Sequence, residues 1–127
     1  MALNLVNNES YEMVPTRDGT YVAPSGNTSI TSDVKVRQVG NVVFISGTIQ
    51  TSATWNDLTS GNIGGISGVD APANTTKIPI ITGTQASGET ENAGYISIWK
   101  PFGAIHMRLY TTHLTDDVLE INGFYFV

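Results

Sequence analysis

The chain has 127 residues, no cysteine, a formal net charge of −5 and only 13% charged residues. The missing cysteines exclude disulfide frameworks, thiol nucleophiles and cysteine-ligated zinc sites, and the acidic balance argues against a nucleic-acid partner, which requires a basic stripe to neutralise phosphates. No apolar run approaches the ~20 residues of a membrane-spanning helix, and the start lacks the basic and apolar regions of a secretory signal, so we expect no membrane insertion.

Strands are predicted along almost the whole chain. Runs rich in Val, Ile, Thr and aromatic residues alternate with Gly, Pro, Asn and Asp, which is typical of strands and turns. The predicted strands span residues 20–23, 34–39, 42–50, 77–82, 95–99, 104–110 and 118–127. Many short strands with regular turns indicate a sandwich or a barrel. We therefore expect one all-β domain, an antiparallel β-sandwich, over residues 1–127.

The clearest local prediction is a hairpin over residues 34–50 with Gly40-Asn41 at its tip. A two-residue type II′ turn needs a positive φ at its first position, which Gly supplies without steric cost. The turn also fixes the cross-strand register. The predicted pairs are Val39 with Val42, Gln38 with Val43, Arg37 with Phe44, Val36 with Ile45, and Lys35 with Ser46. One face then lies in the core, and on the other Arg37 can lie over the Phe44 ring.

Residues 51–76 differ from the rest because they are rich in Gly, Ser, Thr and Asn. A long insertion of this kind is often functional, although short edge strands near residues 63–66 could interrupt it. The run "GNIGGISG" (61–68) lacks the Lys of a phosphate-binding loop, and no helix pattern follows it. It therefore predicts a flexible loop or a turn. Residues 82–94 predict a second, solvated loop.

A second hairpin is predicted around "KPFG" at residues 100–103. Its core face carries Ile96, Ile98, Ile105, Met107 and Leu109. Its opposite face carries Tyr95, Ser97, Trp99, His106, Arg108 and Tyr110. Residues 104–122 could also form a helical stripe, but strict alternation and several threonines favour two strands joined around Asp116-Asp117.

Aromatic residues provide the candidate binding site. Saccharide binding combines an aromatic platform, which takes up the apolar face of a pyranose, with a few well-placed hydrogen-bonding groups. The candidate saccharide-binding residues are Trp55, Asp57, Trp99, His106, Arg108 and Tyr110. Both tryptophans could instead be anchors of the core or of a subunit interface.

No residue pattern predicts catalysis, a metal site or a cofactor. His106 and His113, the only histidines, are seven residues apart and lack a metal-binding spacing. Two carboxylates could in principle pair for glycoside hydrolysis. The carboxylates considered are Asp57, Asp70, Glu89, Glu91, Asp116, Asp117 and Glu120. Nearly all lie in predicted polar loops, where turn formation and solubility account for them, so we expect a protein that is not an enzyme.

Three motifs, taken in order, resemble the C-terminal head of receptor-binding and tail-fibre proteins from tailed phages of Gram-positive bacteria. They are "VRQVGNVVFISG" (36–47), "YISIWKPFGAI" (95–105) and the closing "INGFY" (121–125), and the resemblance covers residues 34–127. It implies a jelly-roll-like β-sandwich that forms a homotrimer at the tip of a phage tail or baseplate. It also implies contact with other tail or baseplate proteins and binding of host cell-wall polysaccharide or teichoic acid. It supplies no residue-level site.

The chain departs from the full-length phage pattern because it has no long N-terminal shoulder, coiled coil or β-helix neck. We expect an excised head or a small accessory subunit, with N-terminal strands and a linker region in residues 1–33. Three functions remain open. The chain could be an adhesin head that recognises a host saccharide, or a structural tail domain whose aromatic residues hold a trimer together. The weakest alternative is a polysaccharide-cleaving enzyme.

Overall fold

The computed structural model describes residues 14–24, 30–51, 62–82, 92–111 and 118–127. Eight strands follow one another along the chain. They are β1 (Thr16–Val22), β2 (Ile30–Val39), β3 (Val42–Thr51), β4 (Asn62–Ser67), β5 (Thr76–Thr82), β6 (Asn92–Phe102), β7 (Ala104–Thr111) and β8 (Val118–Phe126). Within these ranges the chain forms no helix, and hence none that could cross a membrane.

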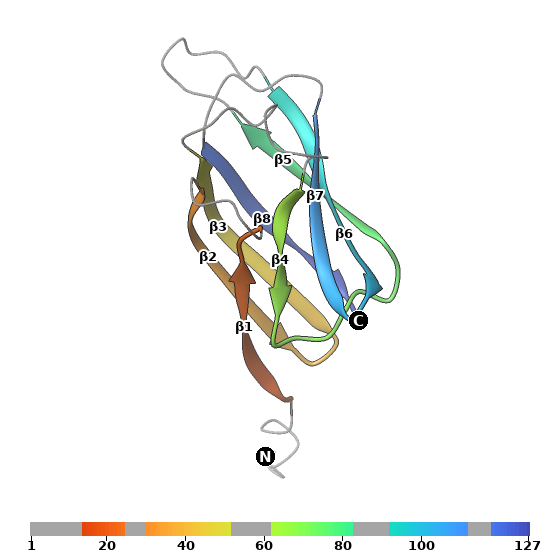
Figure 1. Ribbon diagram of the computed structural model, residues 1–127. Coiled ribbons are helices and arrows are strands. Elements are labelled where there is room, and N and C mark those ends of the chain that lie inside the picture. Colours follow the sequence, from red (N-terminus) through yellow and green to blue (C-terminus); the bar gives the residue numbers. More distant parts are fainter. Residues whose placement is uncertain (1–13, 25–29, 52–61, 83–91, 112–117) are drawn as a thin grey trace, which may run out of the picture.

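The strands form one antiparallel, barrel-like sheet (Figure 1), in the order β1-β2-β3-β8-β5-β6-β7-β4. β1 joins the two halves on one side, because Thr16–Gly19 pair with β2 and Thr20–Val22 pair with β4. On the other side, β5 and β8 share one residue pair, Thr82 with Leu119. The predicted all-β antiparallel domain is therefore confirmed, with its sheet closed into a barrel-like form. A jelly-roll sandwich stays a prediction.

The hairpin predicted around Gly40-Asn41 is confirmed in its register. Gly40 has a φ of 59°, and the paired residues run from Val39 with Val42 through Lys35 with Ser46 as predicted. The register is well specified because a slip of one residue would turn the apolar side chains of the hairpin toward solvent and its polar side chains toward the core.

Two features of the neighbouring strand differ from what the sequence suggests. Asp18-Gly19 is a pair typical of turns, but both residues lie inside β1. Gly19 is needed there because a Cβ would lie 2.8 Å from the carbonyl oxygen of Ser67. The expected stacking of Arg37 on Phe44 is not found in the described part of the chain, since Arg37 Nε donates to Asp18 Oδ1 at 2.9 Å.

The core is built from the inward positions of the strands and is dominated by Ile. Its members are Val36, Val43, Ile45, Ile49, Ile63, Ile66, Ile78, Ile96, Ile98, Ile105, Met107, Leu109, Leu119, Ile121 and Tyr125. All core residues predicted for the second hairpin are among them. Both predicted hairpins therefore present the expected face to the interior, and strand alternation places every second side chain on the outer surface.

The glycine-rich run at 61–68, predicted as a loop or a turn, contains β4. The strand considered near residues 63–66 is therefore found, but it is not an edge strand, because it pairs with both β1 and β7. A Cβ on Gly64 would lie 2.3 Å from the carbonyl oxygen of Val22, and one on Gly65 would lie 2.3 Å from that of Ile105. These glycines therefore allow close approach of two neighbouring strands. Of residues 104–122, those that the structure describes lie in the strands β7 and β8 and not in a helix.

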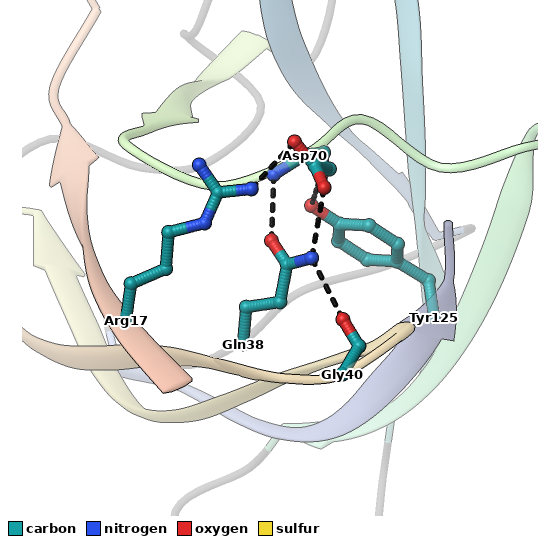
Figure 2. A network of polar contacts seen from close by, with 5 residues as sticks. All are labelled: Arg17, Gln38, Gly40, Asp70 and Tyr125. Carbon is teal, nitrogen blue, oxygen red and sulfur yellow. Dashed lines mark hydrogen bonds and ion pairs between the residues drawn. The ribbon is translucent and has the colours of Figure 1, made fainter. Parts of the chain in front are cut away.

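A polar cluster that we call the Asp70 clamp fastens β1, β2 and β8 to the segment between β4 and β5 (Figure 2). It consists of Arg17, Gln38, Gly40, Asp70 and Tyr125. The buried Gln38 donates its Nε2 to Gly40 O and to Asp70 Oδ2, both at 2.9 Å, and its Oε1 accepts from Asp70 N at 2.8 Å. Tyr125 donates its hydroxyl to Asp70 O at 2.6 Å, and Arg17 forms an ion pair with Asp70 at 2.6 Å.

The clamp corrects the expectation that Asp70 only forms a turn or aids solubility. Hydrogen bonds from Gln38 and Arg17 lower the pKa of Asp70 below its ordinary value of 3.8. Burial raises the pKa of Tyr125 to about 12, and the charge of Asp70 adds to the effect. At neutral pH the carboxylate is therefore ionised and the phenol protonated, as their bonds in the clamp require. Both pKa values move away from neutrality, so neither group changes its protonation state near pH 7.

Replacing Asp70 tests the acid limit of the clamp. The pKa of Asp70 is lower in the folded than in the unfolded chain. The contribution of Asp70 to the free energy of unfolding is therefore complete above its pKa in the unfolded chain, and it is lost as the pH falls through its pKa in the folded chain. We expect Asp70→Asn to lower the urea midpoint at neutral pH, and the difference from wild type to shrink as the pH falls below the ordinary carboxyl pKa of 3.8. Asp33→Asn, an exposed carboxylate on β2, is the matched control. An unchanged neutral-pH midpoint would contradict the clamp.

Tyr125 tests the alkaline limit. Its pKa is raised from 10.0 to about 12 in the folded chain. The contribution of Tyr125 to the free energy of unfolding is therefore complete below its pKa in the unfolded chain, and it is lost as the pH rises through its pKa in the folded chain. We expect absorbance titration of tyrosinate to show a late-ionising group that Tyr125→Phe removes. Tyr21, whose pKa burial also raises to about 12, should still ionise late in that variant. If Tyr125→Phe keeps every late-ionising group of the wild type, the assignment of one of them to Tyr125 is wrong.

Candidate functional site

The outward side chains of β5, β6 and β7 form a continuous surface that we call the Tyr–Trp face. Its members are Lys77, Tyr95, Ser97, Trp99, His106, Arg108 and Tyr110. The register pairs Tyr95 with Tyr110, and Trp99 with His106. Because strand side chains alternate, the isoleucines that hold this hairpin in the core also direct these residues outward.

Two ring pairs lie at the two ends of the Tyr–Trp face. Tyr95 and Tyr110 are stacked, with centroids 5.1 Å apart and planes inclined by 18°. Trp99 and His106 lie 5.7 Å apart with an inclination of 32°. Cross-strand aromatic pairs of this kind stabilise a sheet and also present flat apolar surfaces to solvent.

A cation accompanies each ring pair. Lys77 Nζ lies 4.9 Å from the centroid of the Tyr95 ring, and Arg108 Cζ lies 5.6 Å from that of Trp99. Both distances are within the range of cation–π attraction. The ammonium lies over the Tyr95 ring and the guanidinium over the Trp99 ring, so each ring pair has hydrogen-bond donors next to an aromatic face.

Arg108 has one buried donor that is unpaired within the described part of the chain. Its Nε is buried and has no hydrogen-bond partner among the described residues. A guanidinium has five N–H donors and no acceptor, and buried donors are normally bonded. Arg108 therefore has donors suited to a hydroxyl, carboxylate or phosphate oxygen.

The charge of the Tyr–Trp face is opposite to that of the whole chain. The chain carries a net charge of −5, yet the members of the face include Lys77 and Arg108 and no carboxylate among the described residues. Such a surface favours neutral hydroxyls and anionic groups over cations.

A hollow of about 250 Å³ adjoins this face at His106. It is lined by Val22, Ala23, Pro24, Asn62, Gly64, Gly65, Ile66, Ser67, Ala104, Ile105 and His106. Its volume lies below the roughly 300–1,000 Å³ of pockets for drug-sized ligands. The hollow therefore has room only for a small group.

A larger hollow of about 640 Å³ lies where β1 leaves β2, and it is lined by residues 18–19 and 34–37. It contains the Arg37–Asp18 ion pair, in which the two charges neutralise each other. It has no aromatic side chain among its described lining residues. The Tyr–Trp face is therefore the better candidate site, because it combines rings with donors.

The structure brings four of the six predicted site residues together on this face. These are Trp99, His106, Arg108 and Tyr110. Trp99 is half-buried on the outer surface and is not a core residue. Trp55 and Asp57 lie outside the described residues. Lys77 was not predicted, because the pairing of β5 beside β6 cannot be read from the sequence of either strand alone.

The alternative chemistries gain no site in the described part of the chain. Asp70 belongs to the clamp, and Glu120 is an exposed residue of β8. The remaining carboxylates considered for hydrolysis, Asp57, Glu89, Glu91, Asp116 and Asp117, lie outside the described residues. Among the residues that are described, no group of three or more His, Cys, Asp or Glu side chains is arranged to hold a metal ion.

Comparisons with known proteins add no family to this geometry. No protein-family model, curated protein or solved structure matches the chain. The resemblance to phage receptor-binding heads therefore remains a prediction from the three sequence motifs.

The stacking of Tyr95 on Tyr110 can be tested by a double-mutant cycle with alanine. We expect the two substitutions to couple by about 0.5–1.5 kcal/mol in the free energy of unfolding, because an aromatic pair stabilises beyond its buried area. A control cycle combines Tyr95 with Phe124, which lies on β8 in the other half of the barrel, and should be additive. Additivity of Tyr95 with Tyr110 in urea unfolding would show that the rings do not stack in solution.

Proposed function

We propose that this chain is the receptor-binding head of a phage tail or baseplate, and that its Tyr–Trp face binds a saccharide of the host cell wall. The observation that carries the saccharide-binding part is the pairing of ring platforms with Lys77 and Arg108 on one outward surface. The phage part is supported by the three motifs that resemble such heads.

Each ring pair has the features of a pyranose platform. The C–H groups of a sugar ring pack on an aromatic face, while its hydroxyls need donors and acceptors at the edge of that face. Trp99 would supply such a surface, with Arg108 and His106 beside it. The hollow next to His106 would take a small ring substituent.

Wall polysaccharide or teichoic acid is the ligand class that this face favours. Arg108 can bind a phosphate or carboxylate with two parallel hydrogen bonds, and Lys77 supplies a second positive charge on the face. An anionic chain would be repelled elsewhere by an acidic protein, so the local cations would also direct where it binds.

The proposal includes a jelly-roll-like arrangement, a homotrimer and a place at the tip of the virion. The barrel-like sheet supports the first part, because its two halves are joined at β1 and at a β5–β8 contact of one residue pair. Three identical heads on one axis would raise the effective affinity of a weak site through avidity.

A structural role in the tail or baseplate is the second candidate, and one observation favours it. Phe44, Phe124 and Phe126 are about half exposed on the outer surface of β3 and β8, where a subunit contact would cover them. No observation in the described part of the chain favours the polysaccharide-cleaving alternative.

The first experiment is binding of the fluorescently labelled protein to a panel of Gram-positive cells and to their isolated wall polysaccharides. Strain-selective labelling that soluble polysaccharide competes away would support the adhesin. A folded protein that labels no strain and binds no polysaccharide would favour the structural role.

Substitutions on the Tyr–Trp face identify the site. We expect Trp99→Ala and Arg108→Ala each to weaken polysaccharide binding about ten-fold or more, equivalent to ~1.4 kcal/mol, because each removes an anchor of the platform. Arg108→Lys should restore part of the loss, since it keeps the charge but not the fork of donors. Titration calorimetry measures the affinity per site. The control is Gln50→Ala, an exposed position on β3. Unchanged affinity in both variants that remain folded would place the site elsewhere.

A further inference from the structure

The hollow of about 250 Å³ beside the Tyr–Trp face opens where β4 lies between β1 and β7 (Figure 1). The register sets Val22, Gly65 and His106 side by side across these strands. Val22 is exposed and His106 is half-buried, whereas Gly65 has no side chain. The side chains of Val22 and His106 therefore form two walls of the hollow, and the backbone of Gly65 lies between them.

The packing of the neighbouring strands keeps the hollow open. A Cβ on Gly65 would collide with the carbonyl oxygen of Ile105 on β7, and a Cβ on Gly64 with that of Val22 on β1. A side chain therefore fits at neither glycine. Because neighbouring strands lie ~4.8 Å apart, the backbones of Val22 and His106 are separated by roughly 10 Å. This gap exists before any ligand binds, which lowers the cost of binding.

The lining of the hollow combines apolar and polar side chains. Its apolar lining residues on the surface are Val22, Ala23, Pro24 and Ala104, and its polar ones are Asn62, Ser67 and His106. An apolar recess favours a methyl group over water. Polar side chains beside it can bond to the atoms that carry the methyl group, and such bonds fix the orientation of a ligand.

A hydrogen bond to the backbone orients the amide of Asn62. Its Oδ1 accepts from Gly64 N at 3.0 Å, so its Nδ2 is the end that can donate to a ligand. The imidazole of His106, when neutral, has one donor and one acceptor nitrogen. The hollow therefore has both a hydrogen-bond donor and an acceptor next to its apolar lining.

His106 connects the hollow to the ring platform of Trp99. The two residues are paired across β6 and β7, and their ring centroids are 5.7 Å apart. A pyranose that packs on Trp99 would direct a ring substituent past His106 toward Gly65.

An acetamido group is the substituent that matches the hollow. Its methyl suits the apolar lining, its carbonyl oxygen can accept from Asn62, and its N–H can donate to His106. An O-acetyl group lacks the N–H, and the methyl of a deoxy sugar lacks both polar atoms.

We propose that the hollow between Val22 and His106 binds the acetamido group of an N-acetylated amino sugar. The inference rests on the proposed saccharide site and names the class of sugar that this site selects. A plain hexose leaves the recess unfilled. A free amino sugar brings an ammonium group to a face that already carries Lys77 and Arg108, so like charges oppose its binding.

The test uses one wall polysaccharide that the wild-type protein binds, in its native form, after chemical removal of its N-acetyl groups, and after their restoration. We expect the removal to weaken binding about ten-fold or more in titration calorimetry, because a filled apolar recess and its hydrogen bonds are lost. Restoration should recover the affinity. In competition, N-acetylglucosamine and N-acetylgalactosamine should displace the polysaccharide at lower concentration than glucose and galactose.

Two substitutions at Val22 locate the acetamido group. Val22→Trp fills the hollow, and Val22→Thr, the matched control, keeps nearly the same volume. Both residues favour a strand, and Val22 is 48% exposed, so the fold should persist. We expect Val22→Trp to lose the preference for N-acetylated sugars while competition by glucose stays unchanged. Val22→Thr should keep the preference.

Asn62→Asp tests the same contact if Val22→Trp does not fold. The carboxylate keeps an oxygen that accepts from Gly64 N but removes the donor to the acetamido carbonyl. We expect the ratio of the affinities for N-acetylglucosamine and glucose to fall toward one.

The outcomes separate this inference from the proposed function. Equal affinity of the wild-type protein for sugars with and without the acetamido group overturns the inference and leaves the proposed function standing. A preference that persists in the folded variants Val22→Trp and Asn62→Asp also overturns it, because the acetamido group then binds elsewhere. Binding of no saccharide at all overturns the proposed function, and this inference with it.

Discussion

The arrangement of the strands depends on the hydrogen bonds between Gln38 and Asp70. These bonds hold one end of the barrel together. A buried amide costs about 1–3 kcal/mol if a polar atom is left unbonded, and here both ends of the amide are satisfied by Asp70 and the adjacent turn. Asp70 in turn holds Arg17 of β1 and Tyr125 of β8. Since β1 joins the two halves of the sheet, the cluster fixes the strand that closes one side of the barrel.

With that end fixed, strand alternation directs aromatic side chains to two separate outward surfaces. The inward isoleucines of β6 and β7 direct two ring pairs and two cations to one half, and the inward residues of β3 and β8 direct three phenylalanines to the other. The two surfaces differ in chemistry. One has Lys77 and Arg108 over its rings, and the other exposes three phenylalanine rings next to each other.

Local signals made both hairpins predictable, because Gly40-Asn41 fixes one register and strict alternation specifies the faces of the other. The same signals failed where distant segments meet. The glycines of β4 were interpreted as part of a loop that at most short edge strands interrupt, although Gly64 and Gly65 serve the close approach of β1 and β7 on its two sides. Asp70 bonds to Gln38, 32 residues away, and to Tyr125, 55 residues away, and no local pattern encodes such pairs. Four of the six site residues come together because they share one hairpin.

The division of β1 between two neighbours has a mechanical consequence. Tension that enters the described chain at its first residues passes into β1, which is bonded at Thr16–Gly19 to β2 and at Thr20–Val22 to β4. A pull along the strand axis loads these bonds in shear, so that they resist together rather than opening one by one. The ion pair of Arg17 with Asp70 is loaded at the same moment. Both halves of the barrel would therefore share a load applied from that end.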